Sequence, residues 1–358
     1  MNPSQTIAID AMSGDGGPSV ILAAAAQFKR DNPSVELLLV GQQAALQKGI
    51  ESLAVPLQQT AAECEIVAAS EIVAMDEPAS TALRSKKDSS MRIAINTVKE
   101  GRAGACVSAG NTGALLAISK FVLKTLPGIS RPAISTTIPS VGGHTHMLDL
   151  GANVDCTAEQ LFQFAVMGGV LANAVDSNKH PRVGLLNIGS EDIKGNEQVK
   201  AAAVLLANLN EASDFNYIGF VEGNEIYAEH VDVVVCDGFV GNVSLKTSEG
   251  VAKMVSQFMK EEFMRNPLTK LSGLVAKPVL KAFGRRIDPR RYNGASLLGL
   301  KGVVIKSHGG ADAVSFNNAI MHAYREIEKN VPARIGSQID EFLQITQTDG
   351  AEDVESSL

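Results

Sequence analysis

Short segments that are continuously apolar, rather than alternating, recur along the chain and constrain its fold more than any other feature. Examples are "TIAIDA", "VELLLVG", "ACVSAG", "RVGLLNIG" and "VDVVVCDG". Strands that are buried on both faces of a parallel sheet have this pattern. Helical patterns lie between most of them, and one begins at "CTAEQ", where Thr157 and Gln160 can form a capping box. The sequence therefore predicts a doubly wound α/β/α fold with a mostly parallel sheet.

The length of 358 residues is enough for one large α/β domain, which we expect to span residues 1–345. Residues 346–358 are acidic and polar, and this composition predicts a disordered tail.

A helical pattern without any strand occupies residues 251–291, and here we expect an amphipathic hairpin of two helices added to the domain. Between Arg265 and Tyr292 it contains eight basic residues and one acidic residue, Asp288. This local excess of seven positive charges stands in a chain whose net charge is −7. This asymmetry is the most informative charge feature of the sequence.

The composition makes several other functions improbable. Tryptophan is absent and aromatic residues make up 4% of the chain, so we expect no stacking platform for nucleic acid and no nucleic-acid partner. The four cysteines have no metal-type spacing, which predicts buried, reduced thiols. No apolar run approaches the roughly 20 residues that span a bilayer, and no signal-peptide pattern opens the chain. We therefore expect a cytoplasmic protein.

Two histidines, His144 and His146 in "GGHTHML", would face the same side of a strand. No carboxylate stands at a matching offset in the sequence. We therefore expect no metal site, and no cofactor.

The predicted strands end in loops rich in Gly, Asn, Ser and Asp: "AIDAMSGDGG", "VSAGNTGA", "LDLGANVD", "LNIGSEDIKGNE", "VCDGFVGNVSLKT" and "IKSHGG". The carboxyl ends of strands in an open parallel sheet share one edge, so we expect the six loops to meet in one crevice. Bare backbone amides and helix N-termini favour an anion, most simply phosphate. The first loop alone is also compatible with a plain strand-to-helix turn: it is not a Walker A loop, and Ser19 replaces the third glycine of a dinucleotide fingerprint.

Two lysines support an anionic ligand. Lys194 precedes a helix that we expect to begin at Asn196, and Lys246 would lie in the first turn of a helix behind Asn242. A cation is electrostatically misplaced at a helix N-terminus unless it faces an anion. No Gly-x-Ser-x-Gly elbow and no local Cys/His pair is present to supply a nucleophile. The residues that we expect to bind phosphate or substrate are Asp10, Gly14, Gly16, Gly17, Ser108, Gly110, Asn111, Thr112, Asn153, Gly189, Asn196, Asp237, Gly241, Lys246 and His308.

The strings "IAIDAMSGDGGP", "SAGNTGALLA", "RPAI", "LDLGANVDC", "GLLNIGSEDIKGNE", "DGFVGNVSLKTSEG" and "YNGASLLGLKGVVIKSHG", in this order from residue 7 to about residue 325, resemble the bacterial phosphate acyltransferase family of phospholipid synthesis, PlsX. One departure is Ser13, where the family pattern has glycine. The resemblance implies a homodimer with a fold akin to phosphotransacetylases and isocitrate-type dehydrogenases. It also implies transfer of a fatty acyl group from an acyl carrier protein thioester to inorganic phosphate, with Lys194 and Asn242 as the catalytic residues.

The basic hairpin then becomes the expected docking surface for acyl carrier protein, which is small and acidic, or for a membrane surface where a glycerol-phosphate acyltransferase takes the product. A hairpin that merely packs on the dimer partner remains an alternative. So do an NAD-dependent isocitrate-type dehydrogenase with metal-binding aspartates at Asp10, Asp149 and Asp237, and a non-catalytic scaffold. The residues that we expect to dock the partner are Lys277, Lys281, Arg285, Arg286, Arg290 and Arg291.

Overall fold

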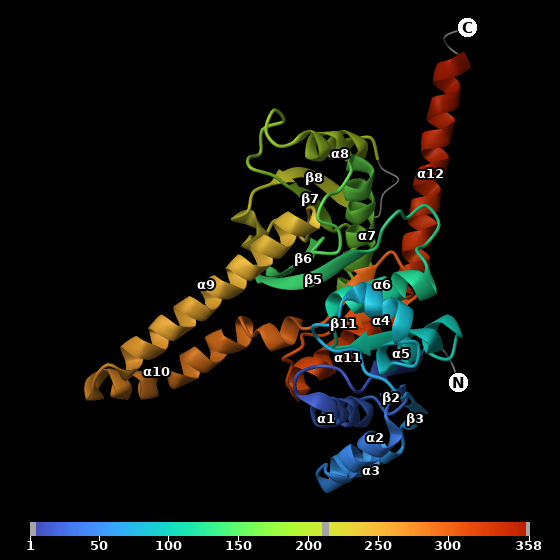
Figure 1. The fold of residues 1–358 in the computed structure, drawn as a ribbon. Coiled ribbons are helices and arrows are strands. Elements are labelled where there is room, and N and C mark those ends of the chain that lie inside the picture. Colours follow the sequence, from blue (N-terminus) through green and yellow to red (C-terminus); the bar gives the residue numbers. More distant parts are fainter. Residues whose placement is uncertain (1–4, 210–214, 356–358) are drawn as a thin grey trace.

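The computed structural model describes residues 5–209 and 215–355, and within them eleven strands form one sheet with helices on both faces (Figure 1). The order of the strands is β3-β2-β1-β4-β11-β10-β5-β6-β9-β7-β8. Seven of the ten strand pairings are parallel. The predicted α/β/α architecture with a mostly parallel sheet is confirmed.

The strands are β1 Thr6–Asp10, β2 Glu36–Gly41, β3 Glu65–Ala68, β4 Ala105–Ser108, β5 Ala133–Ser140, β6 Gly143–Leu148, β7 Arg182–Leu186, β8 Asn216–Val221, β9 Val233–Val235, β10 Ala295–Leu298 and β11 Val303–Lys306. The helices are α1 Gly17–Asp31, α2 Gln43–Glu51, α3 Val55–Ala62, α4 Ala79–Ser85, α5 Ser90–Lys99, α6 Thr112–Leu123, α7 Ala158–Asp176, α8 Glu197–Ala207, α9 Gly238–Met264, α10 Pro267–Arg286, α11 Ala313–Glu328 and α12 Val331–Glu355, with short 3₁₀ helices η3 Glu225–Tyr227 and η4 Pro289–Tyr292.

The core has a layer on each face of the sheet. In β1, Ala8 packs with helices α4, α5 and α6 on one face, whereas Ile7 and Ile9 pack with α1 and α11 on the other. In the second half of the sheet, α7, α8 and α12 cover that same second face. Because every residue of β1 is buried, its continuous apolar pattern reflects burial on both faces.

The two halves of the sheet run in opposite directions, which corrects the expectation of a single shared edge. Three successive pairings, β11 with β10, β10 with β5, and β5 with β6, are antiparallel. Each antiparallel pairing reverses the strand direction, and three reversals leave it reversed. The strands β6, β7, β8 and β9 therefore run opposite to β1, β4 and β11. The six loops therefore form two groups, one for each half.

Sheet twist changes how these two groups face. Adjacent strands are rotated by roughly 20–25°, so the five steps from β4 to β9 rotate the strand axes by roughly 100–125°. Strand ends that would point apart in a flat sheet are thereby turned toward a common side. Figure 1 shows a helical hairpin projecting from that side, between the two halves.

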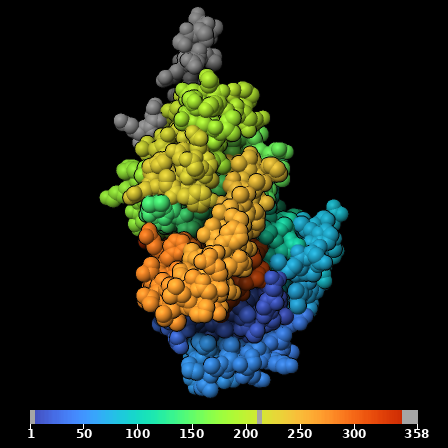
Figure 2. All heavy atoms as spheres, turned by 90° about the vertical axis from the view of Figure 1, so that its left-hand side faces the viewer, coloured from blue at the N-terminus to red at the C-terminus, as the bar shows by residue number. Residues whose placement is uncertain are grey.

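The hairpin formed by α9 and α10 was predicted, but its first helix begins earlier than expected. Helix α9 starts at Gly238 rather than near residue 251, because Asp237 caps it by accepting a hydrogen bond from the Val240 amide. A capping box at Asn266 starts α10. Figure 2 shows the hairpin standing over the face between the blue N-terminal part and the green and yellow part of the molecule.

The C-terminal helix also differs from the prediction. Helix α12 continues to Glu355, across residues 346–355 for which the composition predicted disorder. The last three positions of the predicted tail, 356–358, lie outside the described residues.

Other local predictions are confirmed. Thr157 and Gln160 form the capping box of α7, and Asn196 caps α8. All four cysteines are free thiols, and three of them are buried. None of the helices in the described ranges is both long enough and apolar enough to cross a membrane.

Candidate functional site

The first loop group lies at the ends of β1, β4 and β11. Asp10 is buried at the end of β1, and Ser108 Oγ at the end of β4 donates a 2.6 Å hydrogen bond to its Oδ2. Burial raises the pKa of the Asp10 carboxyl, and the hydrogen bond from Ser108 opposes this rise. Ser13 Oγ donates to the Asp10 carbonyl (2.8 Å) and accepts from the Ala109 amide (3.0 Å). Hydroxyl groups therefore fasten the first loop to the end of β4.

Gly14 allows this loop to approach two others. Its φ is +79°, and a Cβ at this position would lie 3.0 Å from Ala109 Cβ and 3.1 Å from the Gly309 carbonyl oxygen. The Asp15 amide donates to the same carbonyl at 2.8 Å. Only glycine satisfies both the backbone angle and the space. The glycine-rich loop thus packs on the loops that follow β4 and β11.

Several predicted polar residues in this group are used to shape the loops. Asn111 caps α6 through the Ala114 amide (2.9 Å) and donates to the carbonyls of Met75 (2.7 Å) and Glu77 (3.0 Å). The remaining predicted residues of the group are Gly16, which caps α1, Gly17 and Thr112, which begin α1 and α6, Gly110, whose amide donates to Ser108 Oγ, and the exposed His308, whose Nδ1 accepts from the Gly310 amide.

Sequence reasoning missed one charged residue of the first group, Lys306. It is the last residue of β11, and its Nζ donates to the carbonyls of Ser307 and Ala109, the latter at 3.4 Å. Burial lowers the pKa of Lys306 to about 8, and Asp15 opposes this fall. No ion pair among the described residues involves Lys306. A lysine that ends a buried apolar strand, as in "GVVIK", was the signal available in the sequence.

The second loop group lies at the ends of β6, β7 and β9. Its centre is Asp149, which is fully buried and accepts from the amides of Ile134 (2.9 Å), Ala152 (3.2 Å) and Asn153 (2.7 Å). The Asn153 side chain also donates to Asp149 Oδ2 at 3.0 Å and to the Pro132 carbonyl at 2.8 Å. Burial raises the pKa of Asp149, and these hydrogen bonds oppose the rise. Asn153 therefore serves to hold the loop.

Gly241 fixes how closely α9 approaches this loop. A Cβ at position 241 would lie 1.9 Å from the Asp149 carbonyl oxygen and 2.9 Å from Cys236 Sγ. We expect Gly241→Ala to lower the free energy of unfolding by about 3 kcal/mol, the upper end of the usual cost of overpacking, because backbone must move. Urea titration measures the effect. Gly250→Ala is the matched control on the same helix, since nothing lies within 4 Å of a Cβ there. Equal effects of the two substitutions would contradict the close approach.

Lys194 lies in the loop after β7, ahead of α8, as predicted. Its Nζ makes a 2.7 Å ion pair with Glu191, and both side chains are substantially exposed. The hydrogen bond that Lys194 donates to Glu191 raises the pKa of Lys194, so the ammonium is charged at neutral pH. The stem of Lys194 crosses Gly189, where a Cβ would lie 2.3 Å from its Cδ. Gly189 thus leaves space for this lysine.

Lys246 is not in the first turn of a helix, which corrects the reason for choosing it. Because α9 begins at Gly238, Lys246 is the ninth residue of that helix, roughly 12 Å along its axis. Its Nζ pairs with Glu249 at 2.9 Å. The argument from the helix N-terminus therefore applies to Lys194 alone.

Asn242 is the fifth residue of α9 and is exposed. It faces the loop after β6, because a Cβ on Gly151 would lie 3.8 Å from Asn242 Cβ and Cγ. Asn242, Gly241, the cap Asp237 and the Asp149 loop therefore belong to one group. No hydrogen bond or ion pair between described residues joins this second group directly to the first.

The hairpin links the two groups through its two feet. Helix α9 begins in the second group, at Asp237. After α10, Asn293 Oδ1 accepts from the His308 amide (2.9 Å), and Arg290 pairs with Asp312 (3.3 Å), so this end contacts the loop after β11. Arg290 also pairs with Asp288 at 2.7 Å, which occupies a cation that we expected to be available for docking.

The chain was compared with known proteins. A family model described as "Fatty acid synthesis protein" matches residues 5–334. A phosphate acyltransferase of Methylococcus capsulatus is 60% identical over 334 residues, which cover 93% of this chain and 96% of that protein. A second one, from Halorhodospira halophila, is 58% identical over 343 residues, covering 96% and 98%. The chain belongs to the phosphate acyltransferase family. The resemblance inferred from the sequence motifs is therefore confirmed.

Solved structures show how the phosphate acyltransferase chain is built. A phosphotransacetylase of Streptococcus pyogenes aligns with a TM-score of 0.62 at 16% identity, over 90% of this chain and 94% of that one. A branched-chain phosphotransacylase of Enterococcus faecalis aligns with a TM-score of 0.55 at 14% identity, over 90% and 98%. The predicted phosphotransacetylase-like fold is confirmed by these alignments, which concern the fold alone.

The dehydrogenase alternative needs three aspartates around one metal ion. In this structure Asp10 belongs to the first loop group, whereas Asp149 and Asp237 belong to the second, where Asp237 caps α9. The structure thus gives each carboxylate a local role in shaping a loop. Because the chain belongs to the phosphate acyltransferase family, the hypothesis of a dehydrogenase is dropped.

Proposed function

We propose that this phosphate acyltransferase moves a fatty acyl group from an acyl carrier protein thioester to inorganic phosphate. The observation that carries the proposal is the pair of strand-end loop groups, each rich in glycine and each containing one lysine. Lys306 lies in the first group and Lys194 in the second. A glycine-rich loop at a strand end, with a cation beside it, suits the binding of an oxyanion.

The reaction needs no nucleophile from the protein. A phosphate oxygen attacks the thioester carbonyl, a C–O bond forms, the C–S bond breaks, and the electron pair leaves with the carrier's thiolate. A thiol with a pKa of about 8.5 leaves readily as the thiolate, so little acid catalysis is required. The protein instead positions two anionic reactants and stabilises the oxyanion that develops on the carbonyl.

Each lysine receives a distinct role in this proposal. Lys306 and the glycine-rich loops around Gly14 and Gly110 hold the attacking phosphate, while Lys194 and the Asn242 side-chain amide stabilise the oxyanion. The ion pair of Lys194 with Glu191 does not prevent this, because exposed ion pairs are weak. A multiply charged ligand therefore displaces Glu191 readily.

The acyl carrier protein docks on the basic side of α10 in this proposal. Lys277, Lys281, Arg285 and Arg286 lie on α10, and none of them takes part in an ion pair between described residues. The same helix, all of it within the described ranges, has no buried residue. Exposed apolar side chains such as Val275 (76% exposed) and Val279 (71%) would cover the acyl chain or contact a membrane surface.

The assembly and the fate of the product complete the proposal. We propose a homodimer, which sedimentation analysis tests directly. The acyl phosphate passes to an acyltransferase that acts on glycerol phosphate.

The activity is tested by incubating the protein with an acyl carrier thioester and labelled phosphate, then trapping acyl phosphate with hydroxylamine. We expect acyl hydroxamate to form in proportion to both substrates, with release of one carrier thiol for each acyl group transferred. Formation of free fatty acid without hydroxamate would contradict the proposal, because water rather than phosphate would then be the acceptor.

The docking surface gives a separate prediction. We expect Arg285→Glu with Arg286→Glu to raise the KM for the carrier thioester about tenfold and to leave the KM for phosphate unchanged, since steering acts on the acidic partner. The control is Lys48→Glu with Lys179→Glu, which makes the same change in net charge on exposed residues outside the hairpin. Equal shifts in both double variants would indicate a general charge effect and contradict docking on α10.

A further inference from the structure

A cluster of possible metal ligands lies outside both loop groups, on the face of the sheet that α7 covers. His144 and His146 alternate along β6 and share one face of the strand. Asp176, the last residue of α7, reaches both of them: its Oδ1 lies 3.0 Å from His144 Nε2 and its Oδ2 lies 2.7 Å from His146 Nε2. The carboxylate missing from the sequence pattern is thus supplied by another element, which removes the reason for predicting no metal site there.

The three groups have the chemistry and spacing of a divalent-metal site. Two imidazole nitrogens and one carboxylate oxygen, all within 4.8 Å of one another, form the set that zinc accepts when its fourth position is left to water. Zinc binds such atoms at about 2.0–2.2 Å, so an ion between them would replace the present hydrogen bonds with only small movements of the side chains. His144 and Asp176 retain 36% and 25% exposure of their side chains, which leaves a path for an ion to enter.

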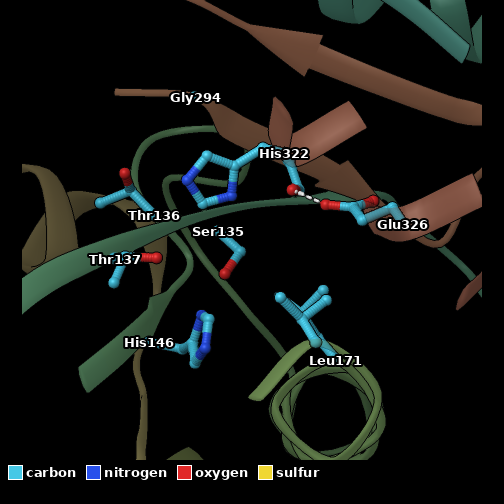
Figure 3. Close-up of a pocket in the computed structure, with 10 residues that line it drawn as sticks. Ser135, Thr136, Thr137, His146, Leu171, Gly294, His322 and Glu326 are labelled. Atoms are coloured by element: carbon cyan, nitrogen blue, oxygen red, sulfur yellow. Dashed lines mark hydrogen bonds between the residues drawn. The ribbon is translucent and has the colours of Figure 1, made fainter. Parts of the chain in front are cut away.

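A second observation points to a bound water molecule beside His146. A cavity of about 10 Å³ adjoins His146 and is lined by Ser135, Thr137, His322 and Glu326 among others (Figure 3). This is about the smallest volume that can hold one water molecule. Ser135 is 2% exposed, and its Oγ has no hydrogen-bond partner among the described residues. In Figure 3 the Ser135 hydroxyl and the His146 ring border the same space, which suits a water molecule bound between these two side chains.

We propose that His144, His146 and Asp176 bind one divalent transition-metal ion, with zinc as the best match to two imidazoles and a carboxylate. Imidazole ligands favour zinc, copper and nickel over magnesium and calcium, which prefer oxygen. The ion would tie β6 to the C-terminal end of α7. It would therefore stabilise the fold rather than take part in acyl transfer.

The test uses the full-length protein, stripped of metal with a chelator and then titrated with zinc chloride or cobalt chloride. We expect one zinc ion per chain by calorimetry, an increase of several degrees in Tm, and the intense visible absorption of tetrahedral cobalt. His144→Gln and Asp176→Asn should abolish all three responses. His180→Gln, which changes an exposed loop histidine, should leave them intact.

Each response is measured as the difference with and without metal in the same variant, so a lower starting stability does not obscure it. Retention of stoichiometric zinc binding by Asp176→Asn would overturn the proposal. So would a wild-type protein that does not bind zinc, which would leave Asp176 as a hydrogen-bond acceptor shared by two histidines. A sulfur-to-cobalt charge-transfer band would place the ion on a cysteine and would overturn it as well.

Discussion

Lys194→Ala should lower kcat by about 10²–10³-fold, the usual effect of removing one donor to a developing oxyanion. The fold should not change, because Lys194 contributes only an exposed ion pair with Glu191. Steady-state kinetics with carrier thioester and phosphate measure the rate, and Tm measures the stability. Turnover close to wild type in a folded Lys194→Ala protein would remove the lysine from the reaction.

Lys246→Ala is the matched control. Like Lys194, this lysine is exposed and pairs with a glutamate three residues away, Glu249. Its place on the ninth position of α9 removes the electrostatic reason for a catalytic role. We therefore expect less than a tenfold effect on kcat. A larger loss for Lys246→Ala than for Lys194→Ala would reverse the assignment of the two lysines.

Lys306→Met should raise the KM for phosphate by about 10²-fold and at the same time stabilise the protein at neutral pH. Both effects follow from an ammonium group held in a largely buried place with only backbone carbonyls as partners. Burial lowers the pKa of Lys306 to about 8, a shift worth on the order of 3 kcal/mol relative to an exposed lysine. Methionine has a similar length without the charge, so it removes this cost along with the cation.

The pH dependence has a definite sign. Above its unfolded pKa of 10.5 the lysine is neutral in both states, whereas between about 8 and 10.5 only the unfolded state binds the proton. The free energy of unfolding of the wild type therefore rises as the pH rises from about 8 to 10.5. This gain disappears as the pH falls back across the window and is absent below about 8. Denaturant titrations from pH 7 to pH 10 should show the stability gap between Lys306→Met and wild type closing.

The control for Lys306 is Lys301→Met, an exposed lysine in the turn before the same strand. It should change neither the KM for phosphate nor the pH profile of stability. If Lys306→Met stabilises the protein but leaves the KM for phosphate unchanged, Lys306 is a buried lysine with no role in binding the anion.

Local patterns in the sequence were enough to predict most of the strands, though not β3 or β10, together with the capping box at Thr157, the cap at Asn196 and the existence of the hairpin. They were not enough to predict strand direction. Apolar periodicity is the same for a strand running either way, so the three antiparallel pairings around β10 and β5 could not be inferred, and one crevice was predicted where two loop groups exist.

The misplaced residues of the site have similar causes. Lys246 was assigned to a first turn because Asn242 is a plausible cap, whereas Asp237 is the cap in the structure. Asp176 stands 30 positions from His146, beyond the range of any spacing rule. Lys306 carries no motif of its own and becomes notable only through its burial. Contacts between distant segments decide each of these cases.

Helix α9 is one uninterrupted rod of 27 residues, roughly 40 Å long, with Asn242 at its base and the hairpin tip at its far end. A rigid lever transmits rotation along its whole length. In the proposed function, a carrier protein docked on α10, which packs against α9, would also set the angle at which the Asn242 side chain is presented. Carrier docking and the orientation of Asn242 would then both depend on the hairpin. A break in α9 between residues 246 and 258 would uncouple them.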